Sequence, residues 1–520
     1  MKFNIYTVIA FALYAVIILA IGIWGFLKAK STKDYFLGGR QLGSWTTAIS
    51  AQASDMSGWL LMGLPGSVLV GGMTQSWIAI GLFIGTYLNW LIVAKRLRKM
   101  SYAAGDAITI PEYLQKRFFT KSPVVRLICA AIIFFFFLIY TASAFSGGAK
   151  LFNFVFGTDY TLSLTIGALI IISYTFLGGF LAVCWTDLIQ GLLMFAALVV
   201  VPIVVMCKVP DLGMAFQNAL SETTEICGNQ ITDYYWSFIH APDGSLAITT
   251  IVSGLAWGLG YFGMPHILVR FMAIKNSDMI KKSRIIATVW VFITLAAAVL
   301  VGALGLIFLH DPQNADLLAE FNALGDSEKI FMFLSSSLLP ALIVGIILAA
   351  ILAAIMSTAD SQLLVTSSAV TNDMFKIFKK KASEKTLMWV SRGTVIVVAI
   401  IAYIIALDEH STVMGLVSYA WAGLGAAFGP VMLLSLFWKR MTMPGAVAGI
   451  VTGGAAVIIW ENVSVFKATE IYSLLPAFVL ALLAIIVVSL VTKVDKEKVD
   501  DLFKRAAAHN IDETPAEKSE

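Results

Sequence analysis

An aspartate flanked by small and hydroxyl-bearing residues lies in the middle of an apolar stretch of this chain. It is Asp55, in the sequence Ala53-Ser54-Asp55-Met56-Ser57-Gly58-Trp59, and the stretch runs from about residue 43 to about residue 70. A charge this deep in a bilayer costs on the order of several kcal/mol, so such residues are rare and functional by default. The adjacent serines and glycine, followed by Gly63-Leu64-Pro65-Gly66, favour a helix that breaks within the membrane and lines a cavity. The alternative is an aspartate paired with a basic residue inside the bundle.

A second interruption occurs in a later apolar stretch, from about residue 246 to about residue 269. Its centre reads Trp257-Gly258-Leu259-Gly260-Tyr261-Phe262-Gly263-Met264-Pro265-His266. Three glycines and a proline this close together do not sustain a regular helix without help from neighbours. Paired interruptions in corresponding halves of a chain indicate a transporter binding site. The GxGxxG match here is not a dinucleotide site, because it lies inside an apolar span and not at a strand-to-helix turn.

Hydroxyl groups also gather on one face of a third apolar stretch. Ala354, Ser357, Thr358 and Ser361 are spaced i, i+3, i+4 and i+7, so they share a helix face. Such a face can offer oxygen ligands to a hard cation, and an unwound helix nearby can add backbone carbonyls. Close helix packing explains the same pattern equally well, since small and hydroxyl residues pack membrane helices.

Two more acidic residues are expected towards the inner ends of their spans, Asp187 and Asp360. Either carboxylate serves as a cation relay on the cytoplasmic exit path or as a helix-end group that reaches water.

Aromatic residues accompany the two interruptions. Aromatic walls suit a small organic solute with an apolar ring, because they combine contact area with a hydrogen-bonding edge. The candidates are Trp59, Tyr140, Trp257 and Tyr261. His266, which follows Pro265, fits a packed or loop histidine better than a ligand.

Composition places the whole chain in a membrane. Its 520 residues are 59% hydrophobic and 13% charged, whereas a soluble domain carries about 25% charged residues. HExxH, GxSxG and Walker patterns are absent, and the four cysteines show no metal spacing, so an enzyme is not expected. Cys207 and Cys227 both fall in an expected outer region, which leaves a disulfide open. No ATP-coupling motif occurs, so an ion gradient is the expected driving force.

Hydropathy predicts an all-α polytopic membrane protein with about thirteen transmembrane helices, since about 20 apolar residues cross a bilayer. The expected spans are 5–27, 43–70, 75–94, 124–149, 160–179, 183–207, 246–269, 285–309, 334–368, 393–407, 412–437, 444–460 and 470–492. With the N-terminus outside and the C-terminus inside, all but five of the 36 lysines and arginines fall in cytoplasmic segments. Basic residues are retained in the cytoplasm during insertion, so this asymmetry predicts the orientation.

The two interrupted spans are the second and the seventh, five apart and opposite in direction. This relation predicts an inverted repeat of five plus five helices. The expected divisions are a peripheral first helix and inner loop (1–42), a first repeat (43–210), an extracellular loop (211–245), a second repeat (246–437), two peripheral helices (438–492) and a cytoplasmic tail (493–520). The tail is expected to form a short amphipathic helix around Val499, Leu502 and Phe503, followed by disorder.

The segment from Ala53 to Gly66 resembles the sodium/solute symporters, and within them the bacterial proline carriers. The resemblance covers nearly the whole chain. It is also carried by Tyr35 to Arg40, by Gly178 to Val183 with Trp185-Thr186-Asp187, by Trp257 to His266 and by Gly415 to Gly423. It implies thirteen spans around a ten-helix inverted repeat, and symport of one sodium ion with L-proline. Met264 departs from the glutamine of the enterobacterial form, which bears on affinity or selectivity.

By motif position, the resemblance assigns roles to individual residues. Sodium would be held by Ala53, Met56, Ala354, Ser357 and Thr358. Sodium coupling would involve Asp55, Ser57 and Asp187. Proline would be bordered by Ser57, Gly58, Trp59, Tyr140, Trp257, Tyr261, Phe262 and Pro265.

The sequence therefore favours sodium-coupled uptake of L-proline by alternating access, by a monomer in the plasma (inner) membrane. The expected partners are L-proline, sodium and the lipid bilayer, with no cofactor and no nucleic acid. One alternative is a symporter of another small solute, driven by sodium or protons. An ion channel is a second alternative, since glycine breaks and buried hydroxyls also suit a pore. An intramembrane enzyme lacks a supporting nucleophile–base pair or metal cluster.

Overall fold

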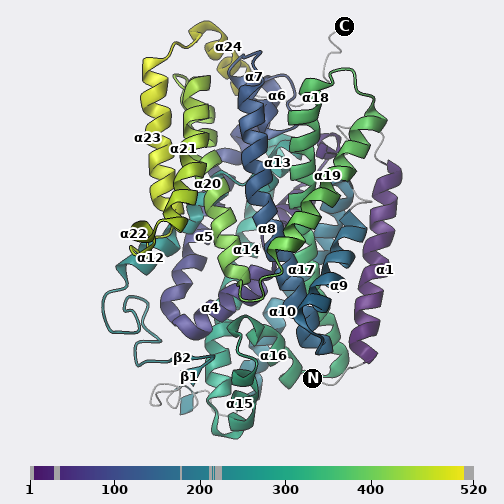
Figure 1. The fold of residues 1–520 in the computed structure, drawn as a ribbon, viewed down its shortest axis with the longest axis vertical. Helices are drawn as coiled ribbons and strands as arrows, with labels where there is room; N and C mark the ends of the chain where they lie inside the picture. The colour runs from purple at the N-terminus through teal and green to yellow at the C-terminus, as the bar shows by residue number, and fades with distance from the viewer. Residues whose placement is uncertain are drawn as a thin grey trace.

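The computed structural model describes residues 5–28, 36–175, 179–209, 213–214, 216 and 225–508. The described residues form long helices that run roughly along one axis, with one short hairpin (Figure 1). The start of α1, α15 and α16 lie at one end of the bundle, and α6, α7 and α24 lie at the other (Figure 1). These are named the α15 end and the α24 end below.

The first half of the chain contributes α1 (Ile5–Lys28), η1 (Gly38–Arg40), α3 (Ser44–Ala53), η2 (Trp59–Gly63), α4 (Leu64–Gly71), η3 (Met73–Gln75), α5 (Ser76–Leu88), η4 (Asn89–Ala94), α6 (Lys95–Ala103), α7 (Ile110–Arg117), α8 (Val124–Phe156), α9 (Tyr160–Thr175) and α10 (Phe180–Lys208), where η marks 3-10 or π-helical turns. An antiparallel hairpin follows, β1 (Glu225–Ile226) and β2 (Asn229–Gln230).

The second half contributes α12 (Ile248–Ala256), η5 (Trp257–Phe262), α13 (Pro265–Ala273), η6 (Ser277–Met279), α14 (Ile280–Leu309), η7 (Pro312–Asn314), α15 (Ala315–Ala323), η8 (Ser327–Lys329), α16 (Ile330–Leu338), α17 (Ala341–Ser368), η9 (Ala369–Phe375), α18 (Lys376–Phe378), α19 (Glu384–Ile405), α20 (Val413–Phe437), α21 (Met443–Asn462), α22 (Ser464–Lys467), α23 (Leu474–Val491) and α24 (Lys496–Ala507).

The number of long apolar helices is that of a polytopic membrane protein. Among the described residues, ten helices are long and apolar enough to cross a bilayer, and a bent pair makes an eleventh. The two other predicted spans correspond to shorter apolar helices, Trp59–Gly71 in the broken second span and Tyr160–Ser173 in the fifth. The all-α fold is confirmed, whereas the total of thirteen spans and the division into two repeats stay predictions.

The second span is broken where the sequence predicts it. Helix α3 ends at Ala53, and residues 54–57 interrupt the helix before η2 and α4 resume it. Within the break, the Met56 amide donates to the Gln52 carbonyl at 2.8 Å, and the Ser57 amide donates to the Asp55 carbonyl at 3.0 Å. The Ala53 carbonyl at the end of α3 accepts from the Ser357 hydroxyl of α17 in place of a continuing helix.

The seventh span is bent by 43° between η5 and α13. The glycines of this segment permit close approach by other helices. A Cβ on Gly260 would overlap the Trp421 indole, and one on Gly258 would overlap the Gly81 carbonyl of α5. Pro265 occupies the first turn of α13, where a missing N–H costs no hydrogen bond. The glycines thus serve packing, not phosphate binding.

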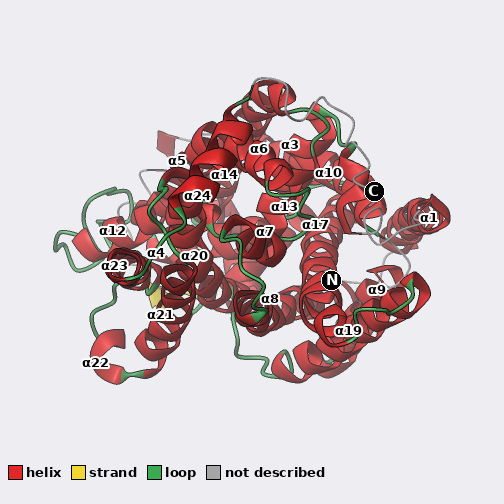
Figure 2. Ribbon diagram, turned by 90° about the horizontal axis from the view of Figure 1, so that it is seen from above, coloured by secondary structure: helices red, strands yellow, loops and turns green. Residues whose placement is uncertain are grey.

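Helix α1 lies on one side of the bundle, and α21, α22 and α23 lie on the opposite side (Figures 1 and 2). The predicted ninth span differs from the structure, since α16 ends at Leu338 and α17 begins at Ala341. Pro340 causes this break, because the residue before a proline is driven out of the helical region and Leu339 is extended (φ −114°, ψ 152°).

The predicted amphipathic helix of the tail is present as α24. Val499, Leu502 and Phe503 are buried, and the Phe503 ring lies 4.9 Å from the Arg117 guanidinium carbon. Residues 509–520 lie outside the described residues, as do Tyr35, Gly178 and most of the predicted 211–245 loop before residue 225. All four cysteines are free thiols, so Cys207 and Cys227 form no disulfide.

Candidate functional site

The hydroxyl face of α17 lies directly against the break of the second span. The Ser357 hydroxyl donates to the Ala53 carbonyl at 2.8 Å, and Thr358 Oγ1 lies 3.4 Å from the same oxygen. Ser357 also contacts the Ala354 carbonyl at 3.0 Å. These residues are fully buried or nearly so. Two carbonyls and two hydroxyls therefore converge at the end of α3, where a helix C-terminus also attracts cations.

Met56, the fifth predicted cation ligand, lies inside the break and is fully buried. Its sulfur lies 3.5 Å from the Thr294 hydroxyl of α14, which fixes the side chain away from α17. The backbone of Met56 remains at the break, one turn from Ala53.

Asp55 joins the two interrupted spans. Its Oδ2 accepts a 2.5 Å hydrogen bond from the Tyr261 hydroxyl of η5, and its carbonyl accepts from the Trp59 indole at 2.8 Å. The second carboxylate oxygen is buried with no hydrogen-bond partner among the described residues. Asp55 is thus held by a tyrosine and not by a basic residue, contrary to the paired alternative.

The predicted aromatic residues gather around this link. The Tyr261 ring meets Trp421 edge-on at 5.1 Å, and the Trp421 indole donates to the Trp257 carbonyl at 2.9 Å. Trp59 and Tyr140 are buried, and the Tyr140 hydroxyl has no partner among the described residues. Trp421 belongs to the site although it was singled out only within a longer motif.

His266 is a further member that the sequence did not indicate. Its ring is fully buried, 5.5 Å from Phe137 and 6.3 Å from Tyr140. Neither ring nitrogen has a partner among the described residues. Buried polar atoms are nearly always hydrogen-bonded, so unpaired groups on Asp55, Tyr140 and His266 fit a place for a polar solute or water. Proximity to Pro265 was the one available signal.

The remaining predicted solute residues lie beside the breaks. Ser57 is nearly fully buried, and a Cβ on Gly58 would touch Ile355 of α17 at 3.3 Å. Phe262 is also buried. Pro265 lines a separate small cavity towards the α24 end, together with Ser361 and Arg270.

Asp187 forms an ion pair that the sequence missed. Its Oδ2 lies 2.9 Å from Arg270 Nη2, and both side chains are at most 1% exposed. Ser50 donates to the same oxygen at 2.6 Å, and Arg270 donates to Ser361 at 2.6 Å. The sequence placed Arg270 in an inner loop, but it lies inside α13. Asp360 is fully buried on α17, next to Ser361.

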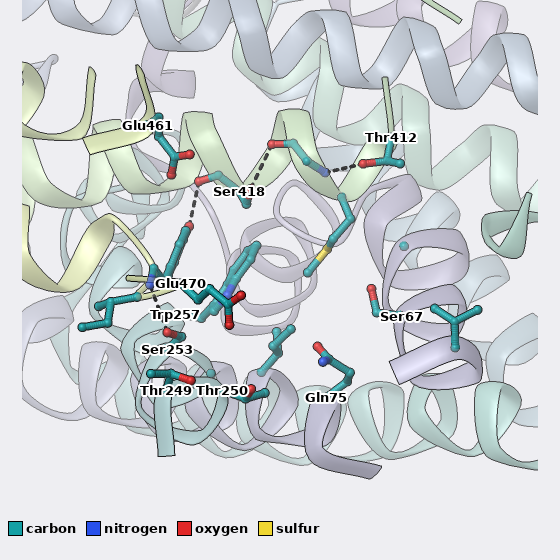
Figure 3. A pocket seen from close by; sticks show the side chains of 18 of the residues that line it. Ser67, Gln75, Thr249, Thr250, Ser253, Trp257, Thr412, Ser418, Glu461 and Glu470 are labelled. Atoms are coloured by element: carbon teal, nitrogen blue, oxygen red, sulfur yellow. Dashed lines mark hydrogen bonds between the residues drawn. The ribbon is translucent and has the colours of Figure 1, made fainter. Parts of the chain in front are cut away.

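A cavity of about 570 Å³ lies on the α15 side of the two breaks (Figure 3). It is lined by α4, α12, α20 and the segment between α21 and α23, and it is named the vestibule below. Trp257 lies at its floor, and hydroxyls of Thr249, Thr250 and Ser253 line one wall (Figure 3). The vestibule therefore leads from the surface to the second break.

Comparison with known proteins decides the family. Residues 35–453 match the model of the sodium:solute symporter family, a range that includes both breaks and the hydroxyl face. The chain belongs to the sodium:solute symporter family. Its members are membrane transporters, so this chain is a transporter and not an enzyme.

Relatives match over nearly their full length. The chain is 44% identical over 492 residues to the osmoregulated proline transporter of Bacillus subtilis strain 168, covering 94% of this chain and 96% of the relative. It is 43% identical to the sodium/proline symporter of Escherichia coli K12, with 96% of each chain covered. A solved Na⁺-coupled sialic acid symporter, substrate-bound and outward-open, superposes with a TM-score of 0.77 at 21% identity, over 95% of this chain and 99% of that one. That likeness supports the fold.

Proposed function

We propose that this chain imports L-proline by symport with sodium. The observation that carries the proposal is the convergence of Ser357 and Thr358 on the Ala53 carbonyl at the broken second span. Oxygen ligands without formal charge suit a monovalent cation that must also be released. The choice of L-proline as the solute rests on the names of the relatives.

Sodium would be held by the carbonyls of Ala53, Met56 and Ala354 and by the hydroxyls of Ser357 and Thr358. When the cation is bound, the two hydroxyls turn their lone pairs towards it and release the Ala53 carbonyl. This joins α3 to α17 and orders the break that contains Asp55, and through Tyr261 it orders the second break. The sodium-loaded protein then presents a formed solute site between the breaks, bordered by Ser57, Gly58, Trp59, Tyr140, Trp257, Tyr261, Phe262 and Pro265.

Proline suits this site because it has an apolar ring and a zwitterionic head group. The rings of Trp59 and Trp257 offer contact area. The free oxygen of Asp55 and the hydroxyl of Tyr140 offer an acceptor and a donor for the charged groups. Joint binding permits one set of helices to rock against the other and opens the site to the opposite side.

The decisive experiment is uptake of radiolabelled L-proline by purified protein in vesicles. We expect saturable uptake that requires an inward sodium gradient and stops when potassium replaces sodium. Uptake that follows pH and ignores sodium would contradict sodium coupling. Flux that rises linearly with proline concentration would favour a channel.

The proposed orientation places the α15 end outside and the α24 end in the cytoplasm of a bacterial cell. The basic segments support it, since lysines and arginines concentrate near α6, α18 and α24. Exposed Asn229 in the hairpin and exposed Lys381 after α18 are suitable reporters. In whole cells and in a background without the four native cysteines, we expect a membrane-impermeant thiol reagent to label Asn229→Cys, and to label Lys381→Cys only after permeabilisation. The reverse pattern would invert the proposed topology.

A further inference from the structure

Tyr472 lies just before α23, in a part of the chain that the sequence assigns to the periphery. Its backbone amide donates to the Ser253 hydroxyl of α12 at 2.9 Å. Its phenol donates to the Ser418 carbonyl of α20 at 2.7 Å. Tyr472 thus bridges α12 and α20, two helices that line the vestibule.

The Tyr472 ring begins an aromatic column that ends at Asp55. It stacks on Trp257 with centroids 4.8 Å apart and planes 18° apart, and Trp257 stacks on Trp421 at 6.5 Å. Trp421 meets Tyr261, whose hydroxyl bonds to Asp55. The solvent-exposed fraction of each residue falls along this column, from 5% at Trp257 to 1% at Trp421 and Tyr261 and to zero at Asp55. Tyr472 is therefore the last ring on the vestibule side.

We propose that Tyr472 is the outer wall of the solute site and the lid that must leave Trp257 before a solute can pass from the vestibule to Asp55. The inference rests on the proposed transport function. Two neutral hydrogen bonds and one stacked ring hold the lid, so the open form lies within thermal reach. The vestibule above it supplies hydroxyls and the carboxylates of Glu461 and Glu470 to receive a polar solute (Figure 3).

Access of a reagent to the buried side of the lid tests the proposal. In a background without the four native cysteines, Ser57→Cys reports on the site and Thr250→Cys reports on the vestibule. An impermeant thiol reagent applied from the vestibule side should label Ser57→Cys slowly. With Tyr472→Ala, we expect labelling about tenfold faster or more. With Tyr472→Phe, which keeps the ring and loses the bond to Ser418, the increase should be several-fold.

Controls separate a lid from general packing. Labelling of Thr250→Cys should be the same in every background. Tyr160→Ala is a matched aromatic change, since the Tyr160 phenol also donates to a backbone carbonyl, that of Ala406 at 2.9 Å, but the ring lines a different cavity. It should leave the labelling of Ser57→Cys unchanged. Equal labelling of Ser57→Cys with and without the Tyr472 ring, in protein that keeps its melting temperature, would overturn the proposal.

The assay also separates this proposal from the function. Labelling needs no solute, so it tests the lid even if proline is not the substrate. If Tyr472→Ala speeds labelling and protein with the native Ser57 takes up no proline under a sodium gradient, the lid stands and the solute assignment fails.

Discussion

Asp55 has one neutral partner in a fully buried place, and one of its carboxylate oxygens has none among the described residues. A buried carboxylate in that condition is stabilised by a nearby cation. Its position two residues after Ala53, inside the break, therefore couples the charge of Asp55 to occupancy of the proposed sodium site. Because the Tyr261 hydroxyl donates to Asp55, a change in the position or charge of Asp55 also affects the second break.

Asp55→Asn should raise the sodium concentration for half-maximal uptake by about tenfold or more, because the attraction to the cation is lost. Tyr261→Phe keeps the charge and removes only the hydrogen bond, so its effect should be smaller. Uptake measured over a sodium titration tests both variants. Unchanged sodium dependence in Asp55→Asn would remove this residue from the mechanism.

Thr358→Val preserves shape and deletes one hydroxyl, so sodium binding should weaken by about tenfold while proline binding at saturating sodium changes little. Thr366→Val is the control, since the Thr366 hydroxyl bonds to the Gln362 carbonyl of its own helix at 2.7 Å. Calorimetric titration with sodium measures the difference. Equal effects of the two substitutions would place the cation elsewhere.

At the scale of elements, the bend of the seventh span brings Arg270 of α13 against Asp187 of α10, Ser50 of α3 and Ser361 of α17. The Arg270 guanidinium therefore links four helices, α3, α10, α13 and α17, on the α24 side of the two breaks. A rocking motion must carry these four helices together or part this cluster.

Arg270→Met should destabilise the protein by about 3–5 kcal/mol, because it leaves the Asp187 charge buried without its cationic partner. The double substitution Arg270→Met with Asp187→Leu should recover much of that loss, since no charge remains. Thermal unfolding in detergent measures both. If the double variant is as unstable as the two single variants combined, the pair is not the source of the effect.

The breaks of the second and seventh spans are predictable, because glycine, proline and a deep carboxylate are local signals. The hydroxyl face is predictable from spacing. Its contact with the Ala53 carbonyl, on which the proposed cation site rests, depends on the tertiary fold and was not predictable. The Asp187–Arg270 pair was not predictable, since Arg270 follows an interrupted helix and looks like a loop residue. The proposed role of Tyr472 depends on the packing of the segment before α23 against α12 and α20, which are distant in sequence, so no local pattern predicts it.

At the scale of the molecule, the proposed sodium and solute sites are adjacent parts of one ordered structure, so each ligand should assist the binding of the other. Linkage requires that sodium tighten proline binding by the same factor by which proline tightens sodium binding. We expect a factor between about 5 and 150. Paired binding titrations of the purified protein test this equality. Proline affinity that does not respond to sodium would contradict coupling at equilibrium.

The close backbone contact between α5 and the seventh span also limits which amino acids can occupy the contact positions. Gly81 and Gly85 of α5 lie against Gly254 and Gly258, so a methyl group at any of these four positions would overlap a neighbouring backbone or side-chain atom. Each glycine codon there is one base change from several codons that add a side chain. A saturating mutational screen should therefore recover almost no functional replacement at these positions, even though none of them is among the proposed sodium or solute residues.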